Sequence, residues 1–364
     1  MKQKTLRAAA ALVAAVLFLP PAANAAPEVS ARSAILVDAL SGRVLFEKDA
    51  DSKSLIASTT KIMTGLLTAE EGELDRTIQI PPEAVGIEGS SLYLQTGEEL
   101  TLEELLFGMM LRSGNDAAVA LAIAVSGSVE AFVARMNEKA QTLGLQSTHF
   151  ANPNGLDDDG NYSTARDLAK LACSAMENET FRQVVSTKNY TFGSRSIANH
   201  NKLLWRYDGA VGIKTGFTKA AGRILVSAAE RDGRRLVAVT INAPNDWSDH
   251  AAMLDYGFEA YRPAPLLEGG ELLGAVPVVG GTTVVVQCQV GEDFSYPMLP
   301  EETAEIRLIL PKFTFAPVEV GETAGAAQAL VNGQVVGEAE LIWAGSAAQQ
   351  QPEKKGFLVR LFGG

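Results

Sequence analysis

Patterns typical of β-strands lie at both ends of a long block of helical sequence, and this order limits the folds that are open to the chain. Residues 33–38 and 43–48 read as two strands around a turn, and residues 223–230 and 235–242 form a second pair joined by an Asp-Gly turn. Between the two pairs, apolar residues recur at helical spacing. This order favours an α+β domain, in which early and late strands form one antiparallel sheet with the helices packed on it.

Several helices are expected in the central block. Thr101-Leu-Glu-Glu104 matches a capping box, in which each of the two outer residues binds the other's backbone N–H group through its side chain. Gly144 is suited to end another helix, because glycine adopts the left-handed conformation at little cost. Helices are expected from Ser58 and from Thr101 onward, and over residues 117–125, 128–143, 163–176 and 250–261.

A change of composition after Pro263-Ala-Pro265 marks the end of the first domain. The sequence beyond it is rich in Val, Gly and Thr, and short strands are expected over residues 276–279, 282–290, 305–310 and 335–343. We therefore predict an α+β domain over residues 26–262, a small all-β domain, a β-sandwich, over residues 263–346, and a linker with a tail over residues 347–364.

The N-terminus has the three regions of a secretory signal peptide. Lys2, Lys4 and Arg7 precede an uninterrupted apolar stretch over residues 8–19, and Ala23-Asn-Ala25 fits a cleavage site. The apolar stretch is too short to span a membrane as a helix. Residues 1–25 are therefore predicted to direct export of the chain.

The last residues predict contact with a membrane surface. As a helix they would present apolar and basic side chains to an anionic bilayer, although Gly356 weakens that helix. A solvated, frayed tail is the alternative. With the export signal, the pattern favours the extracytoplasmic face of the cell membrane. The apolar side chains are Phe357, Leu358, Leu361 and Phe362, and the basic ones are Lys354, Lys355 and Arg360.

Composition and residue spacing argue against several classes of partner. The chain has 31 Lys and Arg against 43 Asp and Glu, a net charge of −12, so no nucleic-acid partner is expected. Cys173 and Cys288 lie in different predicted domains and are expected to be separate buried thiols. His149, His200 and His250 fit no metal-binding spacing and are expected to have structural roles, so neither a metal nor a cofactor is expected.

Three short motifs carry the chemistry that the sequence predicts. Ser58-Thr-Thr-Lys61 stands at the start of an expected helix, Ser113-Gly-Asn115 in a break between two helices, and Lys214-Thr-Gly216 beside a strand. Each is weak alone, because the first could be a helix cap, the second a turn and the third a strand end. Together and in this order, they are typical of penicillin-binding proteins and class A β-lactamases.

The first motif predicts a nucleophile and its base. Residues three apart on a helix share a face, so Lys61 can reach the hydroxyl of Ser58. A serine hydroxyl needs such a base, but a lysine with the ordinary pKa of about 10.4 is protonated at neutral pH. Burial and a second cation both lower the pKa of a lysine, and Lys214 is our candidate for that cation. The helix dipole would also favour negative charge developing at Ser58.

The second motif is expected to take part in proton transfer. Ser113 would relay a proton to the leaving amine, and Asn115 would bind the substrate amide and hold Lys61 in place. The backbone N–H groups of Ser58 and Phe217 are the expected oxyanion hole, and losing one donor of this kind costs about 2.7–4 kcal/mol of transition-state stabilisation.

The third motif predicts the substrate-binding edge of the site. Lys214 and Thr215 are expected to bind a carboxylate of the substrate. Gly216 would let the substrate backbone approach the strand closely, because it has no side chain.

Longer stretches around the motifs resemble one family, the serine-type D-alanyl-D-alanine carboxypeptidases or low-molecular-mass penicillin-binding proteins. The resemblance runs over about residues 33–261 and is carried by several stretches. These are residues 57–64, 110–118, 155–158, 162–167, 199–204 and 212–222.

The resemblance implies a fold, an activity and partners. The implied fold is a transpeptidase-like α+β domain, followed by a β-rich domain and an amphipathic C-terminal anchor. The implied reaction removes the terminal D-alanine from peptidoglycan stem pentapeptides through an acyl-enzyme, in cell-wall maturation. β-Lactam antibiotics would be inhibitors, and no metal or organic cofactor is implied.

Two departures from the family pattern concern the site. Some relatives have a histidine where Asn154 stands. Some also use an arginine shortly after the second late strand to hold the substrate carboxylate, and residues 242–247 contain none. Arg223 is one substitute, and Lys214 with Thr215 is another.

Two alternative functions fit parts of the sequence. A β-lactamase runs the same first step, but its fast deacylation needs an added general base, and no motif supplies one. A non-catalytic wall-binding protein could keep the fold, but Ser58, Lys61 and Lys214 are all present. Labelling with penicillin would separate these functions.

Overall fold

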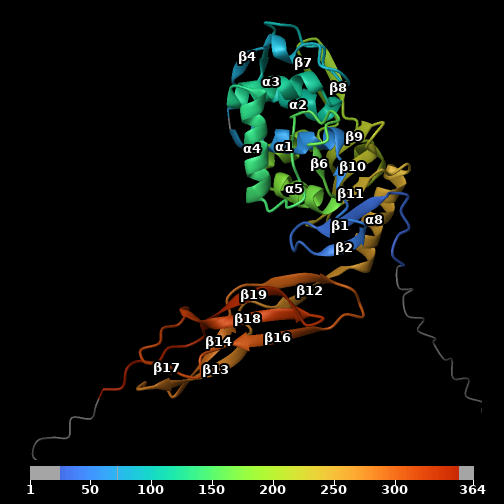
Figure 1. Cartoon of the computed structure of the whole chain (residues 1–364). Helices are drawn as coiled ribbons and strands as arrows, with labels where there is room; N and C mark the ends of the chain where they lie inside the picture. Colours follow the sequence, from blue (N-terminus) through green and yellow to red (C-terminus); the bar gives the residue numbers. More distant parts are fainter. Residues whose placement is uncertain (1–24, 72, 352–364) are drawn as a thin grey trace, which may run out of the picture.

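The structure is a computed structural model that describes residues 25–71 and 73–351. The predicted signal peptide up to residue 24 and the predicted membrane-binding residues from 352 onward lie outside the described residues. Figure 1 shows a larger domain of helices and strands and a smaller domain of strands, which meet where helix α8 (Asp246–Ala260) leads into strand β12 (Arg262–Leu267). The predicted α+β class with a separate all-β domain is confirmed.

A five-stranded antiparallel sheet forms the centre of the larger domain. Its order, β2-β1-β11-β10-β9, joins the two early strands to the three late ones. Ile35 of β1 lies opposite Val239 of β11, and Lys214 of β9 lies opposite Val226 of β10. Strand β9 is at the edge, so one of its sides has no neighbouring strand in this sheet. The strands are β1 (Ser33–Asp38), β2 (Val44–Lys48), β9 (Ala210–Thr218), β10 (Gly222–Arg231) and β11 (Arg234–Ile241).

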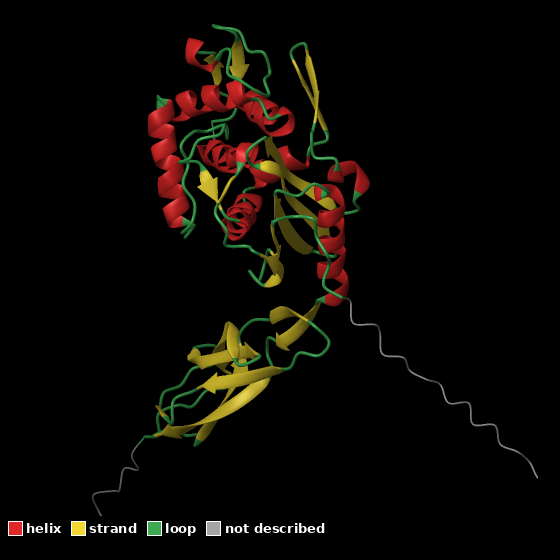
Figure 2. Cartoon of the chain, turned by 45° about the vertical axis from the view of Figure 1, so that its right-hand side comes forward, coloured by secondary structure: helices red, strands yellow, loops and turns green. Residues whose placement is uncertain are grey.

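Both faces of this sheet are covered, because successive side chains of a strand point to opposite faces. Ile35 and Val37 of β1 pack into the large core with the helical block, whereas Ala34 and Leu36 pack into a second core with Leu254 of α8. Figure 2 shows helices on both sides of the sheet. Two buried faces explain why β1 is a continuous apolar run rather than an alternating one.

The helical block lies between β2 and β9 in the sequence. The capping box predicted at Thr101 is present: the backbone N of Glu104 donates to Oγ1 of Thr101 (3.1 Å), and the backbone N of Thr101 donates to Oε2 of Glu104 (2.9 Å). The helices of the block are α1 (Lys61–Glu71), α2 (Leu102–Arg112), α3 (Asn115–Ser126), α4 (Val129–Thr142), α5 (Ala165–Glu177), α6 (Glu179–Ser186) and α7 (Leu203–Arg206).

Two of the predicted helices begin three or more residues from the predicted start. Ser58 lies in the short 3-10 helix η1 (Ala57–Thr60), and α1 begins only at Lys61. Ala57, the first residue of η1, has a φ of 45°, outside the helical region, so the turn that carries Ser58 is not regular α-helix. Helix α8 begins at Asp246 rather than at His250, so it includes polar residues that carry no helical apolar period.

The smaller domain consists of one six-stranded sheet and one two-stranded sheet, where the sequence predicted a β-sandwich. The six-stranded order is β16-β18-β19-β14-β13-β17, and β12 pairs with β15. Strand β18 was not expected, because its sequence is rich in Ala and Gly, which have low β-propensity. The strands are β13 (Leu272–Val279), β14 (Val285–Val290), β15 (Phe294–Met298), β16 (Ala304–Ile309), β17 (Thr314–Phe315), β18 (Thr323–Val331) and β19 (Gln334–Trp343).

Arg43 connects the two domains. Its Nη1 donates to the backbone oxygen of Pro297 (2.5 Å), and its Nη2 pairs with Oε1 of Glu302 (2.5 Å). Its Cζ also lies 5.0 Å from the ring centres of both Tyr261 and Tyr296. The arginine therefore has partners in the smaller domain and at the junction.

The remaining described elements are short. They are β3 (Ser54–Leu55), β4 (Thr77–Gln79), η2 (Pro82–Ala84), β5 (Glu99–Thr101), β6 (Tyr162–Ser163), β7 (Asn189–Phe192) and β8 (Arg195–Ala198). Cys173 and Cys288 are free thiols. Over residues 25–71 and 73–351, no single helix is long and apolar enough to cross a membrane; α3 with α4 meets the length and composition criteria only as a pair bent by 85°.

Candidate active site

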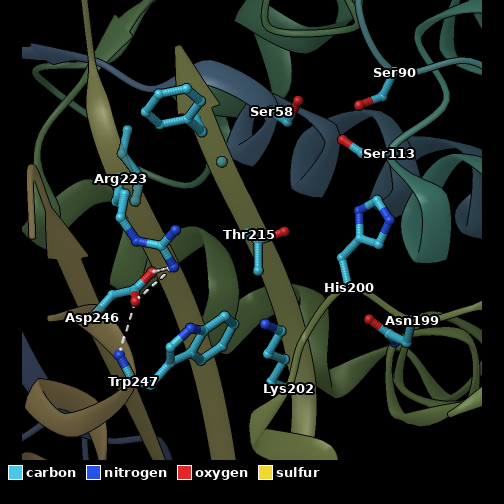
Figure 3. A pocket seen from close by; sticks show the side chains of 13 residues that line it. Ser58, Ser90, Ser113, Asn199, His200, Lys202, Thr215, Arg223, Asp246 and Trp247 are labelled. Atoms are coloured by element: carbon cyan, nitrogen blue, oxygen red, sulfur yellow. Dashed lines mark hydrogen bonds and ion pairs between the residues drawn. The ribbon is translucent and has the colours of Figure 1, made fainter. Parts of the chain in front are cut away.

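A cavity of about 490 Å³ opens where the edge of the sheet meets the helical block. Its walls come from η1 with Ser58, the turn between α2 and α3 with Ser113, strands β9 and β10, and the start of α8. Figure 3 shows the hydroxyls of Ser58 and Ser113 near Thr215 of β9. The structure therefore brings residues of all three sequence motifs to one cavity.

Lys61 lies beneath Ser58 and is completely buried. Its Nζ is 3.2 Å from Oγ of Ser58 and 2.6 Å from Oδ1 of Asn115, and it also contacts the backbone oxygen of Asn154. The two asparagines offer acceptors, so they take two N–H groups of the amine. A neutral amine then has its lone pair left for the proton of Ser58. This arrangement suits a base beside its serine.

Burial sets the protonation of the two lysines. It lowers the pKa of Lys61 well below the usual 10.5, and the charge of Lys214 lowers it further, against a smaller opposing effect of Asp116. Burial also lowers the pKa of Lys214 to about 7. Burial therefore favours the neutral form of both lysines, and the charge of Lys214 favours it further for Lys61.

The turn between α2 and α3 holds the second motif in place. Ser113 ends α2 in the left-handed conformation, with a φ of 64°, and Asn115 is the first residue of α3. Nδ2 of Asn115 donates to the backbone oxygen of Glu88 (2.6 Å), which fixes its Oδ1 toward Lys61. The amide of Asn115 is therefore oriented from both ends.

Asp116 fixes the loop that faces this turn. Its carboxylate is fully buried and accepts hydrogen bonds from Oγ of Ser91 (2.6 Å) and from the backbone N of Leu92 and of Leu94 (2.9 to 3.2 Å). The loop places Ser90 on the cavity wall. Asp116 follows the second motif directly, but its partners are distant in sequence, and no local pattern predicts them.

Strand β9 passes close to the turn that carries Ser58. A Cβ on Gly216 would lie 3.3 Å from both the backbone oxygen of Ile56 and the backbone N of Ser58, closer than most side-chain contacts. Glycine therefore permits the approach, and Phe217, which is 64% exposed, follows it on the cavity wall. The N–H groups predicted for the oxyanion hole belong to these two adjoining segments.

Lys214 also belongs to β9, and its side chain is buried. It is 1% exposed, and its Nζ donates to the backbone oxygen of Thr215 (3.0 Å). Of the third motif, Thr215 and Gly216 line the cavity. Lys214 is therefore placed to act by its charge behind the cavity wall.

His200 lines the cavity, although the sequence predicted only a structural role for it. Its Nε2 lies 3.1 Å from Nη1 of Arg112, which can only donate, so this nitrogen accepts and the ring is neutral. The sequence signal that could have placed His200 in the site is the family resemblance of residues 199–204, which include it. Other lining residues that the sequence did not single out are Ser90, Asn199, Lys202, Asp246 and Trp247.

The other two histidines lie away from the cavity lining. His250 is buried between Oγ of Ser227 (2.6 Å) and Oγ1 of Thr240 (2.9 Å), and burial lowers its pKa to about 3. Nδ1 of His149 contacts the backbone oxygen of Gly160 (2.6 Å). Within the described part of the chain, no group of three His, Cys, Asp or Glu residues could hold a metal ion.

The fold and the site together define a class of protein. A five-stranded antiparallel sheet with helices on both faces, a serine beside a buried lysine, and a Lys-Thr-Gly edge strand are the features of serine peptidases of the penicillin-binding type. The model of the D-alanyl-D-alanine carboxypeptidase family, peptidase family S11, matches residues 21–245. The chain belongs to this family and is a serine peptidase.

Curated relatives and solved structures agree with this membership. The chain is 32% identical to D-alanyl-D-alanine carboxypeptidase DacF of Bacillus subtilis, over 91% of this chain and 88% of the relative. It is 32% identical to D-alanyl-D-alanine carboxypeptidase DacC of Escherichia coli, over 95% and 91% of the two chains. Penicillin binding protein 5 from Haemophilus influenzae has a similar structure, with a TM-score of 0.76 and 28% identity over 89% of this chain and 99% of that chain.

A shorter solved structure matches about two thirds of the chain. The Streptomyces K15 DD-transpeptidase has a TM-score of 0.62 and 37% identity, and the match covers 64% of this chain and 99% of that chain. The match to penicillin binding protein 5 thus extends over more of this chain than the match to the transpeptidase.

Proposed function

We propose that this enzyme removes the terminal D-alanine from peptidoglycan stem pentapeptides through an acyl-enzyme on Ser58. The family supports the carboxypeptidase reaction. One observation supports the assignment of the residues: Nζ of Lys61 is 3.2 Å from Oγ of Ser58, and its other partners, Asn115 and Asn154, are acceptors. These contacts leave the lone pair of a neutral amine for the serine proton.

In acylation, Lys61 takes the proton of Ser58 while Oγ attacks the carbonyl carbon between the last two D-alanines. The N–H groups of Ser58 and Phe217 stabilise the oxyanion. The proton then passes from Lys61 through Ser113 to the leaving nitrogen, the C–N bond breaks, and D-alanine departs. Asn115 binds the substrate amide and holds Lys61 throughout.

In deacylation, a water molecule gives its proton to Lys61 and attacks the ester carbonyl. The ester bond breaks, Oγ of Ser58 takes the proton back, and the shortened peptide leaves. During acylation, Thr215 on the cavity wall and the charge of Lys214 behind it help to hold the substrate carboxylate, and Gly216 lets the peptide lie along β9.

Penicillin would enter the same first step, because it offers a strained amide and a carboxylate. Among the described residues, Asp246 is the one carboxylate that lines the cavity, and both its oxygens bind Arg223. No free carboxylate is therefore available there as an added base for water. Unlike D-alanine, the leaving group of penicillin also stays tethered to the acyl-enzyme, where it hinders the approach of water to the ester beside Lys61. We expect a long-lived adduct, which separates this enzyme from a β-lactamase.

Mass spectrometry after incubation with benzylpenicillin tests the proposal. We expect one adduct, on the peptide that contains Ser58, and none in Ser58→Ala. Ser90→Ala is the matched control, because Ser90 also lines the cavity. An adduct that persists in Ser58→Ala, or one that is lost in Ser90→Ala, would contradict the assignment.

We also propose that the enzyme is exported and acts at the extracytoplasmic face of the membrane. The division into residues 1–25, 26–262, 263–346 and 347–364 belongs to this proposal, with the last segment on the membrane surface. The basic and apolar N-terminal pattern and the amphipathic tail support it.

Exposed apolar side chains at the end of the all-β domain give further support. Phe313 and Phe315 are 51% and 65% exposed, and Val279 is 47% exposed. Backbone hydrogen bonds from Ala316 to Val279 (3.0 Å) and from Gln350 to Gly280 (2.8 Å) place the end of the described chain beside them. In Figure 1 this end of the domain points away from the larger domain.

Sedimentation with vesicles tests the membrane contact. The mature chain and a variant that ends at residue 351 would be mixed with vesicles of phosphatidylglycerol and phosphatidylcholine. We expect the mature chain to bind the anionic vesicles, Phe315→Ser to bind them more weakly, and the shortened chain to bind least. Equal binding of the mature and shortened chains would contradict the role of the tail.

A further inference from the structure

A carboxypeptidase cuts peptides that end in a free carboxylate, and a site that requires this end must offer it hydrogen-bond donors and positive charge. Among the described residues, Lys202 and Arg223 are the cations whose side chains line the cavity. Lys214 is buried and already donates to the backbone oxygen of Thr215 (3.0 Å). An arginine suits a carboxylate better than a lysine, because its planar guanidinium presents five N–H groups in a fixed arrangement.

Arg223 is fixed to the sheet next to the edge strand. It lies opposite Phe217 of β9, and its backbone oxygen accepts a hydrogen bond from the backbone N of Ala243 (3.0 Å). Its side chain is 43% exposed and lines the same cavity as Thr215. Figure 3 shows Thr215 between Arg223 on one side and Ser113 on the other.

Asp246 and Trp247 hold the guanidinium. The Asp246 side chain is 3% exposed, and its two oxygens accept from Nη2 of Arg223 at 2.8 and 2.7 Å. Oδ1 of Asp246 also accepts from the backbone N of Trp247 (2.9 Å), and the Trp247 ring centre lies 5.9 Å from Cζ of Arg223. The first residues of α8 thus fix the position of the arginine.

Only one nitrogen of Arg223 is used by these contacts. Its Nε and Nη1 make no hydrogen bond to any residue in the described part of the chain, so they keep three N–H groups for another anion. Asp246 offsets the charge of the arginine at long range. Binding therefore depends on direct hydrogen bonds, which favour a carboxylate over a neutral group at this place.

We propose that Arg223, held by Asp246 and Trp247, binds the terminal carboxylate of the substrate and makes the site selective for peptides that end at the second D-alanine. This inference rests on the proposed function, because it assumes that Ser58 attacks the last peptide bond. It adds a residue that determines specificity for that reaction.

The experiment compares Arg223→Gln, Arg223→Lys and Lys202→Gln on two peptides. One is an N-acylated peptide that ends in D-Ala-D-Ala, and the other is the same peptide with a C-terminal amide. We expect Arg223→Gln to lower kcat/KM for the free acid about 30-fold, mainly through KM, as for the loss of hydrogen bonds to a charged group. We expect it to change kcat/KM for the amide less than about twofold, and Arg223→Lys to restore part of the loss.

Two results would overturn the inference. One is an equal loss on both peptides, or no loss, in Arg223→Gln. The other is a larger selective loss in Lys202→Gln than in Arg223→Gln. Thermal unfolding of each variant checks that the fold is kept.

Labelling of Ser58 by an uncharged penicillin ester separates this inference from the proposed function. We expect wild type and Arg223→Gln to be acylated by the ester at similar rates, because the ester lacks the carboxylate. If the ester and penicillin itself both fail to acylate Ser58 in the wild type, the proposed function is wrong and the inference falls with it.

Discussion

Nζ of Lys61 lies 3.2 Å from Oγ of Ser58. The contact is made within a single tight turn, because Ser58 lies in η1 and Lys61 is the first residue of α1. Asn115, the first residue of α3, accepts a hydrogen bond from the same amine at 2.6 Å. A base that is fixed and buried needs little rearrangement before it takes the proton.

Replacing the base with a side chain that stays positively charged should slow acylation strongly. In Lys61→Arg the guanidinium stays protonated, so it cannot take the proton of Ser58. We expect the rate of acylation by benzylpenicillin to fall by about 10²–10⁴-fold, the usual contribution of a general base. Stopped-flow fluorescence or quenched mass spectrometry measures that rate. A rate within about tenfold of the wild type would show that another group acts as the base.

The pH dependence should report Lys214. Burial lowers the pKa of Lys214 to about 7, so its positive charge is lost as the pH rises through this value. We expect kcat/KM, which reports the free enzyme, to fall above about pH 7. A bound carboxylate raises the pKa of a nearby ammonium, so kcat should fall only at a higher pH. A kcat/KM that still rises toward about pH 10 would instead indicate lysines with ordinary pKa values.

Asp116 should be important for both stability and activity. Asp116→Ala would leave the hydroxyl of Ser91 and the backbone N–H groups of Leu92 and Leu94 without their buried acceptor. We expect a loss of about 2–4 kcal/mol in the free energy of unfolding and slower acylation, because Asn115 depends on the same loop. Urea unfolding measures the first effect. Asp158→Ala, in an exposed loop, is the control, and equal effects of the two substitutions would contradict the expectation.

Gly216 should be needed for catalysis more than for folding. The Cβ of Gly216→Ala would press on the backbone oxygen of Ile56 and the backbone N of Ser58, both 3.3 Å away. The strand would shift from the turn that carries the nucleophile, and we expect about a 10²-fold slower acylation, as for the loss of one oxyanion donor. Gly345→Ala, where the nearest atom is 4.0 Å away, is the control. Unchanged acylation in Gly216→Ala would argue against a close approach of the strand.

The α+β class could be predicted from the sequence because the sheet has two buried faces. Strands β1, β10 and β11 appear as long apolar runs, and the Thr101 capping box is purely local. The start of α1 could not be predicted, because the φ of 45° at Ala57 depends on packing: a Cβ on Gly155 would collide with the Ala57 backbone. The turn is thus shaped by a segment that is distant in sequence.

The site could be predicted only where its contacts are local or its motifs are specific. The spacing of Ser58 and Lys61 gives their contact directly. The position of His200 could not be predicted, because the backbone N of His200 donates to the backbone oxygen of Leu111, which is distant in the sequence. The pairing of Arg223 with Asp246 likewise appears only in three dimensions. It joins the start of β10 to the first residue of α8, and strand β11 lies between these two elements in the sequence.

The protonation of Lys61 is the claim on which the mechanism depends, and its titration by NMR tests it most directly. In enzyme with 13C-labelled lysine, the Cε signal of Lys61 can be assigned by comparison with Lys61→Arg. Because burial and the charge of Lys214 lower its pKa, we expect this signal to titrate well below the usual 10.5, and at a higher pH in Lys214→Met than in the wild type. A Lys61 that stays protonated up to about pH 10 in the folded enzyme would contradict its role as the base.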